Sequence, residues 1–420
     1  MAVGHAAGSA VTTGRFNTLI GGEAGDAITT GGSNVAVGTY ALTSNTTASF
    51  NTAVGSNALH SNTTGEINVA IGRNAMYDNT TGANNVAVGL AALTSNTTAS
   101  NNTAVGYQAL FDNVTGTSLV AVGYQALANN LGNSNTAVGL SALFANTTGT
   151  ENTGLGTGAL YANTTGASNS AVGYGALDSN TTGSSNTALG RDALTANTTA
   201  NNNVAVGYQA GYTQSTSGDA TYLGYQAGYS RTGSGNTCIG NYSGRDGTTG
   251  TDNTLVGRNS GYTITSGSKN TIIGMYNGNQ HSLDIRTSSN NIVLSDGDGN
   301  PRVVTDSTGK TRAQSYAETY VSLSGTSPTV NCNNGNVFAL TTSGNTTFTF
   351  SNPPASGTAY GFTLKLTSGG SHTITYPNTV DFAGGTAPDA PASGETDVLV
   401  FITVDGGTNW YGALAIDAAG

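Results

Sequence analysis

The strongest constraint on this chain is a short motif that recurs along most of its length. One copy reads Asn102-Thr-Ala-Val-Gly106-Tyr-Gln-Ala-Leu110. Fourteen of the sixteen intervals between the glycines of successive copies are 17 residues, and two are 16. These glycines are Gly4, Gly21, Gly38, Gly55, Gly72, Gly89, Gly106, Gly123, Gly139, Gly156, Gly173, Gly190, Gly207, Gly224, Gly240, Gly257 and Gly274. A short period kept over so many copies predicts a solenoid.

The composition of one copy decides which kind of solenoid is expected. We number each copy from its glycine as position 0, so that position −1 is always Val, Ile or Leu and position −2 is usually Ala. Position +3 is Ala from Ala7 to Ala227, and position +4 is Leu or Met from Leu42 to Leu194. Gly and Asn are too frequent for helix, and the apolar residues lack a 3.6-residue spacing. The sequence therefore predicts an all-β fold, a parallel β-solenoid (β-roll) whose 17-residue coils each hold two short strands and two turns.

The alternation of side chains along a strand predicts where the large residues lie. Positions −2 and −1 are neighbours and both apolar, as are +3 and +4, so each pair sends one side chain to each face. If the thin coil holds only Ala and Gly, the larger residues face outwards, where a second copy of the chain would cover them. The predicted oligomer interface comprises Val54, Val88, Val105, Val122, Val138, Leu110 and Leu127. A flat roll with the large residues inside and Ala outside is the alternative, and that version is compatible with a monomer.

The motifs resemble those of known fibrous proteins. Asn68-Val-Ala-Ile-Gly72 and Asn34-Val-Ala-Val-Gly38 resemble the repeats of trimeric autotransporter adhesin heads, over roughly residues 1–278. The coil here is 17 residues rather than 14, and no coiled-coil stalk or membrane-anchor strands follow. The whole layout is similar to that of bacteriophage tail-fibre and virion-fibre proteins. The resemblance implies a homotrimer with an attachment role and no catalytic site.

The end of the chain breaks the repeat and predicts further domains. Residues 279–312 read as a connecting hairpin, or neck, around the Gly-rich turn Asp296-Gly-Asp-Gly-Asn300. Residues 313–420 alternate in short runs separated by turn signals, which is typical of an antiparallel β-sandwich or jelly-roll-like domain. We expect this domain to carry recognition, because a repeated rod offers only repeated sites. The candidate receptor contacts are Tyr360, Phe382, Trp410 and Tyr411.

Charge and cysteine content exclude several classes of function. The net charge is −10, and no Lys or Arg lies between Arg73 and Arg191, so we expect no nucleic-acid partner. We expect no membrane insertion, because no apolar run is long enough, and we expect no secretory signal, because Met1 is followed directly by a repeat without a charged and apolar leader pattern. Cys238 lies at position −2, which is usually Ala, and is therefore predicted to be a buried thiol. Neither Cys238 nor Cys332 has a His or Asp nearby in sequence at the spacing of a metal site or of an activated nucleophile. We therefore expect no cofactor and no metal site.

Several candidate chemistries compete with a structural role. The acidic residues of the rod are scattered, whereas a polysaccharide-degrading β-helix needs paired carboxylates. Adjacent threonines such as Thr46-Thr47 fit turns better than the flat ladder of an ice-binding solenoid. Asp296, Asp298 and Asn300 begin like a calcium loop, but Pro301 and Ser307 break the signature. A row of tyrosines at position +1, for example Tyr107 and Tyr124, would either stack on sugars or on one another.

The function that fits these expectations is that of a non-enzymatic fibre. We expect a viral tail or head fibre on the virion surface that binds a host cell-surface glycan or protein. A virion or anchor protein would cover the first coil, which starts in mid-repeat at Met1. A bacterial surface adhesin or an extracellular filament subunit shares every one of these features.

Overall fold

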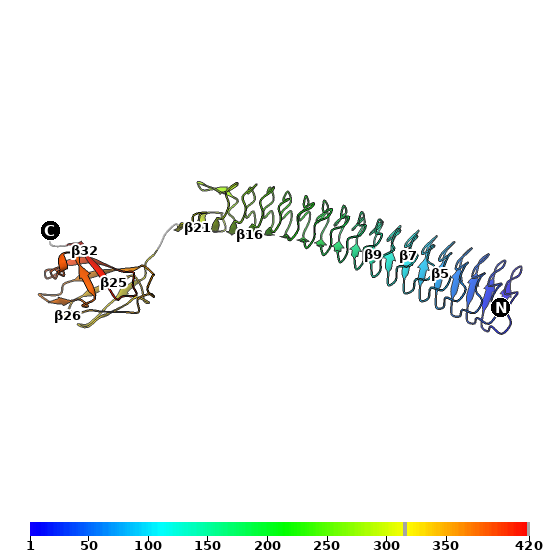
Figure 1. Ribbon diagram of the computed structural model, residues 1–420, viewed down its shortest axis with the longest axis horizontal. Coiled ribbons are helices and arrows are strands. Elements are labelled where there is room, and N and C mark those ends of the chain that lie inside the picture. The colour runs from blue at the N-terminus through cyan, green and yellow to red at the C-terminus, as the bar shows by residue number, and fades with distance from the viewer. Residues whose placement is uncertain (314–316, 418–420) are drawn as a thin grey trace. The chain divides into compact units, whose positions relative to one another are not determined.

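The chain forms two compact units built almost entirely of β-structure (Figure 1). The structure, a computed structural model, describes residues 1–313, which make up the first unit, and residues 317–417, which make up the second. The only helical segment among these residues is the single 3₁₀ turn Ala383–Gly385. The predicted fold class, an all-β solenoid followed by a β-sheet domain, is confirmed.

The first unit is a stack of coils that each contribute one strand to a parallel ladder (Figure 1). Each strand pairs in register with the equivalent residues of the next coil, as Thr52 does with Val69 and Ala53 with Ala70. The strands are β1 (Ala2–Val3), β2 (Thr18–Ile20), β3 (Val35–Val37), β4 (Thr52–Val54), β5 (Val69–Ile71), β6 (Val86–Val88), β7 (Thr103–Val105), β8 (Val120–Val122), β9 (Thr136–Val138), β10 (Thr153–Leu155), β11 (Ser170–Val172), β12 (Thr187–Leu189), β13 (Val204–Val206), β14 (Thr221–Leu223), β15 (Thr237–Ile239), β16 (Thr254–Val256) and β17 (Thr271–Ile273).

The glycine at position 0 is required by the close stacking of the coils. Gly106 has φ +137°, and a Cβ built on it would lie 2.3 Å from the carbonyl oxygen of Gly123 in the next coil. The same approach recurs at each glycine of the column, for example between Gly55 and the Gly72 oxygen at 2.6 Å. A side chain at this position would separate the coils, so the sequence keeps glycine there.

The interior of the coil corrects one prediction. Ala104 at position −2 is fully buried and Val105 at position −1 points outwards, as predicted. Leu110 and Leu127 at position +4, however, are 0% exposed within a single chain, so their assignment to an oligomer interface is wrong.

The reason lies in the backbone around position +4. Gln108 and Leu110 have positive φ angles of 52° and 53°, so this segment is a pair of turns and not the second strand that we predicted. Without a pleat, the neighbours at +3 and +4 are not forced to opposite faces, and Ala109 and Leu110 both point inwards.

Two ladders of buried asparagines hold the turns together. At position −4, the Asn102 amide donates to the Gly116 oxygen at 2.9 Å, and its own oxygen accepts from the Leu119 backbone N–H at 3.0 Å. At position +7, the Asn79 amide donates to the Asn62 side-chain oxygen of the preceding coil at 2.8 Å. These side chains are fully buried, so the Asn-Thr-Thr sequons of the folded rod are not accessible to glycosylation.

The coils that lack Leu at +4 fill the interior from position −2. A Cβ on Gly228 would lie 2.2 Å from the ring of Tyr222, and one on Gly261 would lie 2.7 Å from Leu255. Leu19 occupies the same space near Gly8 and Gly25 at the other end of the rod. The loss of Leu at +4 is thus offset by a larger residue at position −2.

Residues 279–312 pack with the solenoid as part of the first unit, and they include the predicted hairpin around the turn at Asp296–Asn300. After a small hairpin of β18 (Asn279–Gln280) and β19 (Leu283–Asp284), β20 (Ile292–Ser295) adds a parallel strand to β17. The sheet then continues antiparallel through β21 (Pro301–Thr305) and β22 (Thr311–Ala313). The buried Val293 and Val304 extend the core of the rod into this segment, which explains why it packs with the first unit.

The second unit has its own core and a mixed sheet. The sheet order is β23-β25-β28-β31-β32-β30, with antiparallel pairing of β28 to β31 and β31 to β32 and parallel pairing elsewhere. Two short parallel pairs join β24 with β27 and β26 with β29. Val330 of β24, and Phe348 between β26 and β27, belong to the same core as the sheet. The strands are β23 (Tyr320–Ser322), β24 (Thr329–Asn331), β25 (Val337–Thr341), β26 (Thr346–Thr347), β27 (Thr349–Ser351), β28 (Tyr360–Thr367), β29 (Ile374–Thr375), β30 (Val380–Phe382), β31 (Thr396–Thr403) and β32 (Trp410–Ile416).

Candidate binding surfaces

One side of the solenoid is a continuous uncharged surface, which we call the strand face, with an aliphatic residue at position −1 of every coil and mostly Thr or Val at position −3. It consists of the outward residues at positions −3 and −1 of β1–β17 and β20, and it contains no charged residue from Met1 to Leu294. Several of its aliphatic side chains are more than a third exposed: Ile71, Val120, Val138, Leu189, Val204, Leu223, Ile273, Ile292 and Leu294. Of the predicted interface valines, Val54, Val88, Val105, Val122 and Val138 all lie on this face.

The size of the strand face is comparable with that of a protein interface. Eighteen parallel strands at about 4.8 Å spacing make it roughly 80 Å long, and a three-residue strand makes it roughly 10 Å wide. The resulting area of about 800 Å² equals what each partner buries in a standard interface. Phe16, Phe50 and Ile67, exposed by 86%, 63% and 55%, border the first coils of this face.

The tyrosines on the turns of the rod stack mainly on one another. Tyr107 and Tyr124 lie with ring centroids 5.1 Å apart and planes 12° apart, and Tyr208 and Tyr225 are arranged in the same way. Tyr174 is instead covered by the Arg191 guanidinium, 5.3 Å from the ring centroid. One face of each ring in these pairs is therefore occupied by a neighbour, as expected for the ladder of rings that we kept as an alternative to sugar stacking.

The fold brings together one carboxylate pair that the sequence reasoning missed. Asp178 and Asp192 line a shallow notch of about 180 Å³, which opens because position +2 is glycine in two successive coils, at Gly158 and Gly175. Partial burial, and secondarily the Asp192 carboxylate, raise the pKa of the Asp178 carboxyl above its ordinary value. Asp192 is already paired with Arg191 at 3.4 Å. The signal in the sequence is the pair of glycines in successive coils at position +2, where every other coil carries a side chain.

The turn that resembles a calcium loop has a different role for its first aspartate. The Asp296 carboxylate accepts hydrogen bonds from the backbone N–H groups of Asp298 at 3.0 Å and Asn300 at 2.9 Å. It also accepts from the Asn300 side chain, and it forms an ion pair with Arg302. The side-chain and backbone hydrogen bonds of Asn300, with the nearby Arg302, hold the pKa of Asp296 far below its usual range. The carboxylate therefore closes its own turn, between β20 and β21.

This network predicts a pH dependence. Because the pKa of Asp296 is lower in the folded than in the unfolded chain, its contribution to stability is present above the unfolded pKa and is lost as the pH falls toward the folded one. Asp296→Asn should lower the urea concentration at which the first unit unfolds at pH 7. The difference from wild type should shrink progressively as the pH is lowered from about 5 to 2. Asp298→Asn removes the same charge two residues away without removing the acceptor, so an equal effect of both variants would contradict this role.

The second unit places the four candidate receptor residues very differently. Trp410 and Phe382 are 1% and 8% exposed in the core, which excludes them as contacts in the folded unit. The Tyr360 hydroxyl donates to the Gly335 oxygen at 2.6 Å and its ring packs against the core, so this residue is mainly structural. Only Tyr411 is open to a partner, with 53% of its surface exposed. Strand alternation explains the outcome, since Trp410 and Tyr411 are neighbours on β32 and point to opposite faces.

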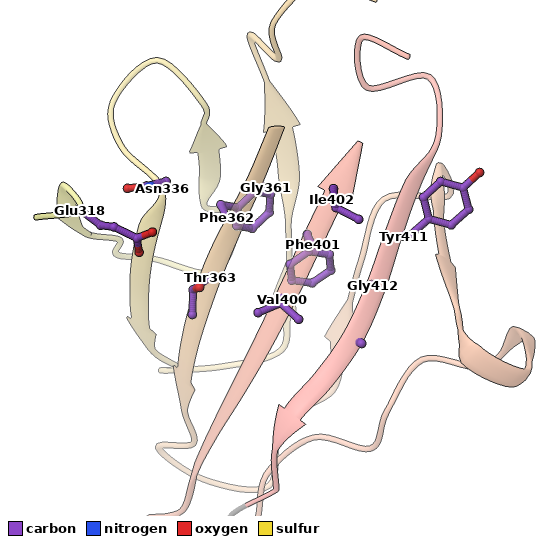
Figure 2. A pocket seen from close by; sticks show the side chains of 11 residues that line it. Glu318, Asn336, Gly361, Phe362, Thr363, Val400, Phe401, Ile402, Tyr411 and Gly412 are labelled. Atoms are coloured by element: carbon purple, nitrogen blue, oxygen red, sulfur yellow. The ribbon is translucent and has the colours of Figure 1, made fainter. Parts of the chain in front are cut away.

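Tyr411 stands at one wall of a groove on the outer face of the sheet, which we call the sheet groove. The groove has a volume of about 480 Å³, and its outward residues come from β28, β31 and β32 (Figure 2). Gly361 faces Ile402 across the sheet, and Ile402 faces Tyr411, so the missing side chain of Gly361 leaves a depression beside two large residues. Figure 2 shows Glu318 and Asn336 on the side of the groove away from Tyr411.

Other kinds of site are not found among residues 1–313 and 317–417. No group of three or more His, Cys, Asp or Glu side chains there is arranged to hold a metal ion. No helix in the same ranges is long and apolar enough to cross a membrane. Both cysteines are unpaired and buried, and burial raises the pKa of the Cys238 thiol.

Comparisons of the chain with protein-family models, with curated proteins and with solved structures give no match in any of the three.

Proposed function

We propose that this protein is a non-enzymatic attachment fibre, of the kind carried on a virion, in which the solenoid is the shaft and the second unit recognises the host surface. The observation that carries the proposal is the strand face, which is free of charge along the whole shaft and presents an aliphatic residue at position −1 of every coil. A surface of this size is compatible with bundling of identical shafts, and we expect a homotrimer.

The division of the chain into two units supports the assignment of roles. The shaft presents similar chemistry in coil after coil, which suits a spacer better than a specific site. The second unit has its own core and an exposed groove with a mixture of apolar and polar groups. Binding sites commonly lie on such non-repeated surfaces.

A cell-surface adhesin or an extracellular filament subunit of a bacterium is the second candidate. The same strand face and the same groove would serve it equally well. The two candidates differ only in the particle or cell that carries the shaft, so immunogold labelling of purified virions and of bacterial cells separates them.

The attachment role is tested by adsorption of the fluorescently labelled full chain to a panel of bacterial cells. We expect retention by a subset of strains. A chain of residues 1–313 should still fold, because the core of the first unit contains no residue of the second. We expect this shortened chain not to be retained, because it lacks the recognition unit. Equal retention of the full chain and of residues 1–313 would place recognition on the shaft. Absence of retention by every strain would contradict the attachment function.

A further inference from the structure

We propose that the sheet groove of the second unit binds an uncharged glycan. This inference rests on the proposed attachment function and specifies its ligand. The groove lies on the outer face of β28, β31 and β32, opposite the core residues Phe362, Phe401 and Trp410. Its volume of about 480 Å³ falls within the range of roughly 300–1,000 Å³ that is typical of small-ligand sites.

The charge of the second unit selects against anionic ligands. Residues 317–417 contain seven carboxylates (Glu318, Asp381, Asp389, Glu395, Asp397, Asp405 and Asp417) against the single cation Lys365, a balance of 1 − 7 = −6. Glu318 is the only charged residue that lines the groove. A carboxylate only accepts hydrogen bonds, so its partner must supply O–H or N–H donors. A sialylated, phosphorylated or other anionic polymer would meet repulsion here, whereas hydroxyl groups would not.

The position of the groove selects against a peptide strand. Peptides that bind to sheets usually add to an edge, where the backbone hydrogen bonds are satisfied. The groove lies instead over strands whose backbone groups are already paired, since β31 lies between β28 and β32. A peptide backbone laid over Val400 and Ile402 would leave its own polar groups without partners.

The lining matches the amphipathic character of a sugar ring. Gly361, Val400 and Ile402 give an apolar floor for the C–H face of a ring. The phenol of Tyr411, the hydroxyl of Thr363, the amide of Asn336 and the carboxylate of Glu318 surround it with hydrogen-bonding groups. Aromatic and apolar contact combined with a few placed polar groups is the usual basis of specificity in such sites.

The test uses the labelled full chain on a printed array of oligosaccharides. The array carries neutral glucose, galactose, mannose and N-acetylhexosamine oligomers beside sialylated and phosphorylated ones, and a Lys/Arg-rich decapeptide is printed as a further probe. We expect retention on neutral glycans only. The affinity for the best-retained glycan is then measured by calorimetry for the wild type and its variants.

Two variants change the groove itself. Gly361→Val places a side chain on the floor of the groove, and a β-branched residue suits a strand, so the fold should persist, as circular dichroism would verify. Tyr411→Ala removes the aromatic wall. Each variant is expected to weaken binding at least tenfold. Tyr320→Ala is the matched control, because Tyr320 lies on β23 of the same sheet, is 63% exposed and does not line the groove.

The results separate this inference from the attachment function. Any of three results would overturn the glycan assignment. The first is retention only on anionic glycans or on the basic peptide, the second is no retention on any glycan, and the third is unchanged affinity in folded Gly361→Val. If the full chain still adsorbs to cells in those cases, attachment stands and only the ligand is wrong. If adsorption to cells fails as well, the attachment function fails with it.

Discussion

A chain carrying Val105→Asp and Val122→Asp is expected to sediment as a monomer of 41.8 kDa, whereas the wild-type chain is expected at about three times that mass. Both valines lie on the strand face, in neighbouring strands β7 and β8. Packing of copies against this face would bury each new carboxylate without a partner, which costs several kcal/mol per ion. Sedimentation equilibrium measures the mass, and circular dichroism shows whether the shaft remains folded.

The matched control is Val114→Asp, which makes the same substitution in the coil of Val105. Val114 is 37% exposed but lies on a turn at position +8, away from the strand face. This variant should keep the mass of the wild type. A wild-type chain that is itself a stable monomer, or a double variant with unchanged mass, would show that copies do not associate through the strand face.

Gly106→Ala is expected to destabilise the shaft by about 3 kcal/mol or more. The backbone of Gly106 has φ +137°, a region that L-residues rarely occupy, and the added Cβ would lie 2.3 Å from the Gly123 oxygen. The coils would have to separate locally, which breaks the hydrogen bond from the Gly123 N–H to the Val105 oxygen at 2.8 Å. Urea unfolding of the full chain, followed by circular dichroism, measures the loss.

A second glycine distinguishes the effect of the column from that of glycine in general. Gly158 has φ +64° at position +2, where the nearest atom to an added Cβ is the Asp178 oxygen at 3.4 Å. Ala91 occupies the equivalent position with φ 56°, so the fold already accepts alanine there. Gly158→Ala should therefore cost only about 1 kcal/mol. Similar losses in both variants would refute the explanation by close stacking of the coils.

The sequence by itself determined the period, the parallel ladder and the placement of Ala104 and Val105 on opposite faces of the strand. The 17-residue spacing of the glycines predicts a solenoid, and the alternation within the strand Thr103-Ala104-Val105 sends neighbouring side chains to opposite faces. The structure decided between the two possible assignments, because it buries Ala104. The enlargement of position −2 at Leu255 and Ile272, where position +4 is glycine, is also visible in the sequence, because a close-packed core keeps its volume from coil to coil.

Only the tertiary structure decided that Leu110 and Trp410 are buried and that the carboxylates of Asp178 and Asp192 line one notch. Leu110 lies inside because its positive φ turns the chain, and a leucine carries no sequence signal for that conformation. Trp410 and Tyr411 are equally plausible contacts in the sequence, and their burial depends on which face of β32 meets the second layer. Asp178 and Asp192 are 14 residues apart in the chain and meet only because coils stack with a defined register. The sheet groove depends in the same way on Gly361, Ile402 and Tyr411 lining up across three strands, which a linear pattern does not encode.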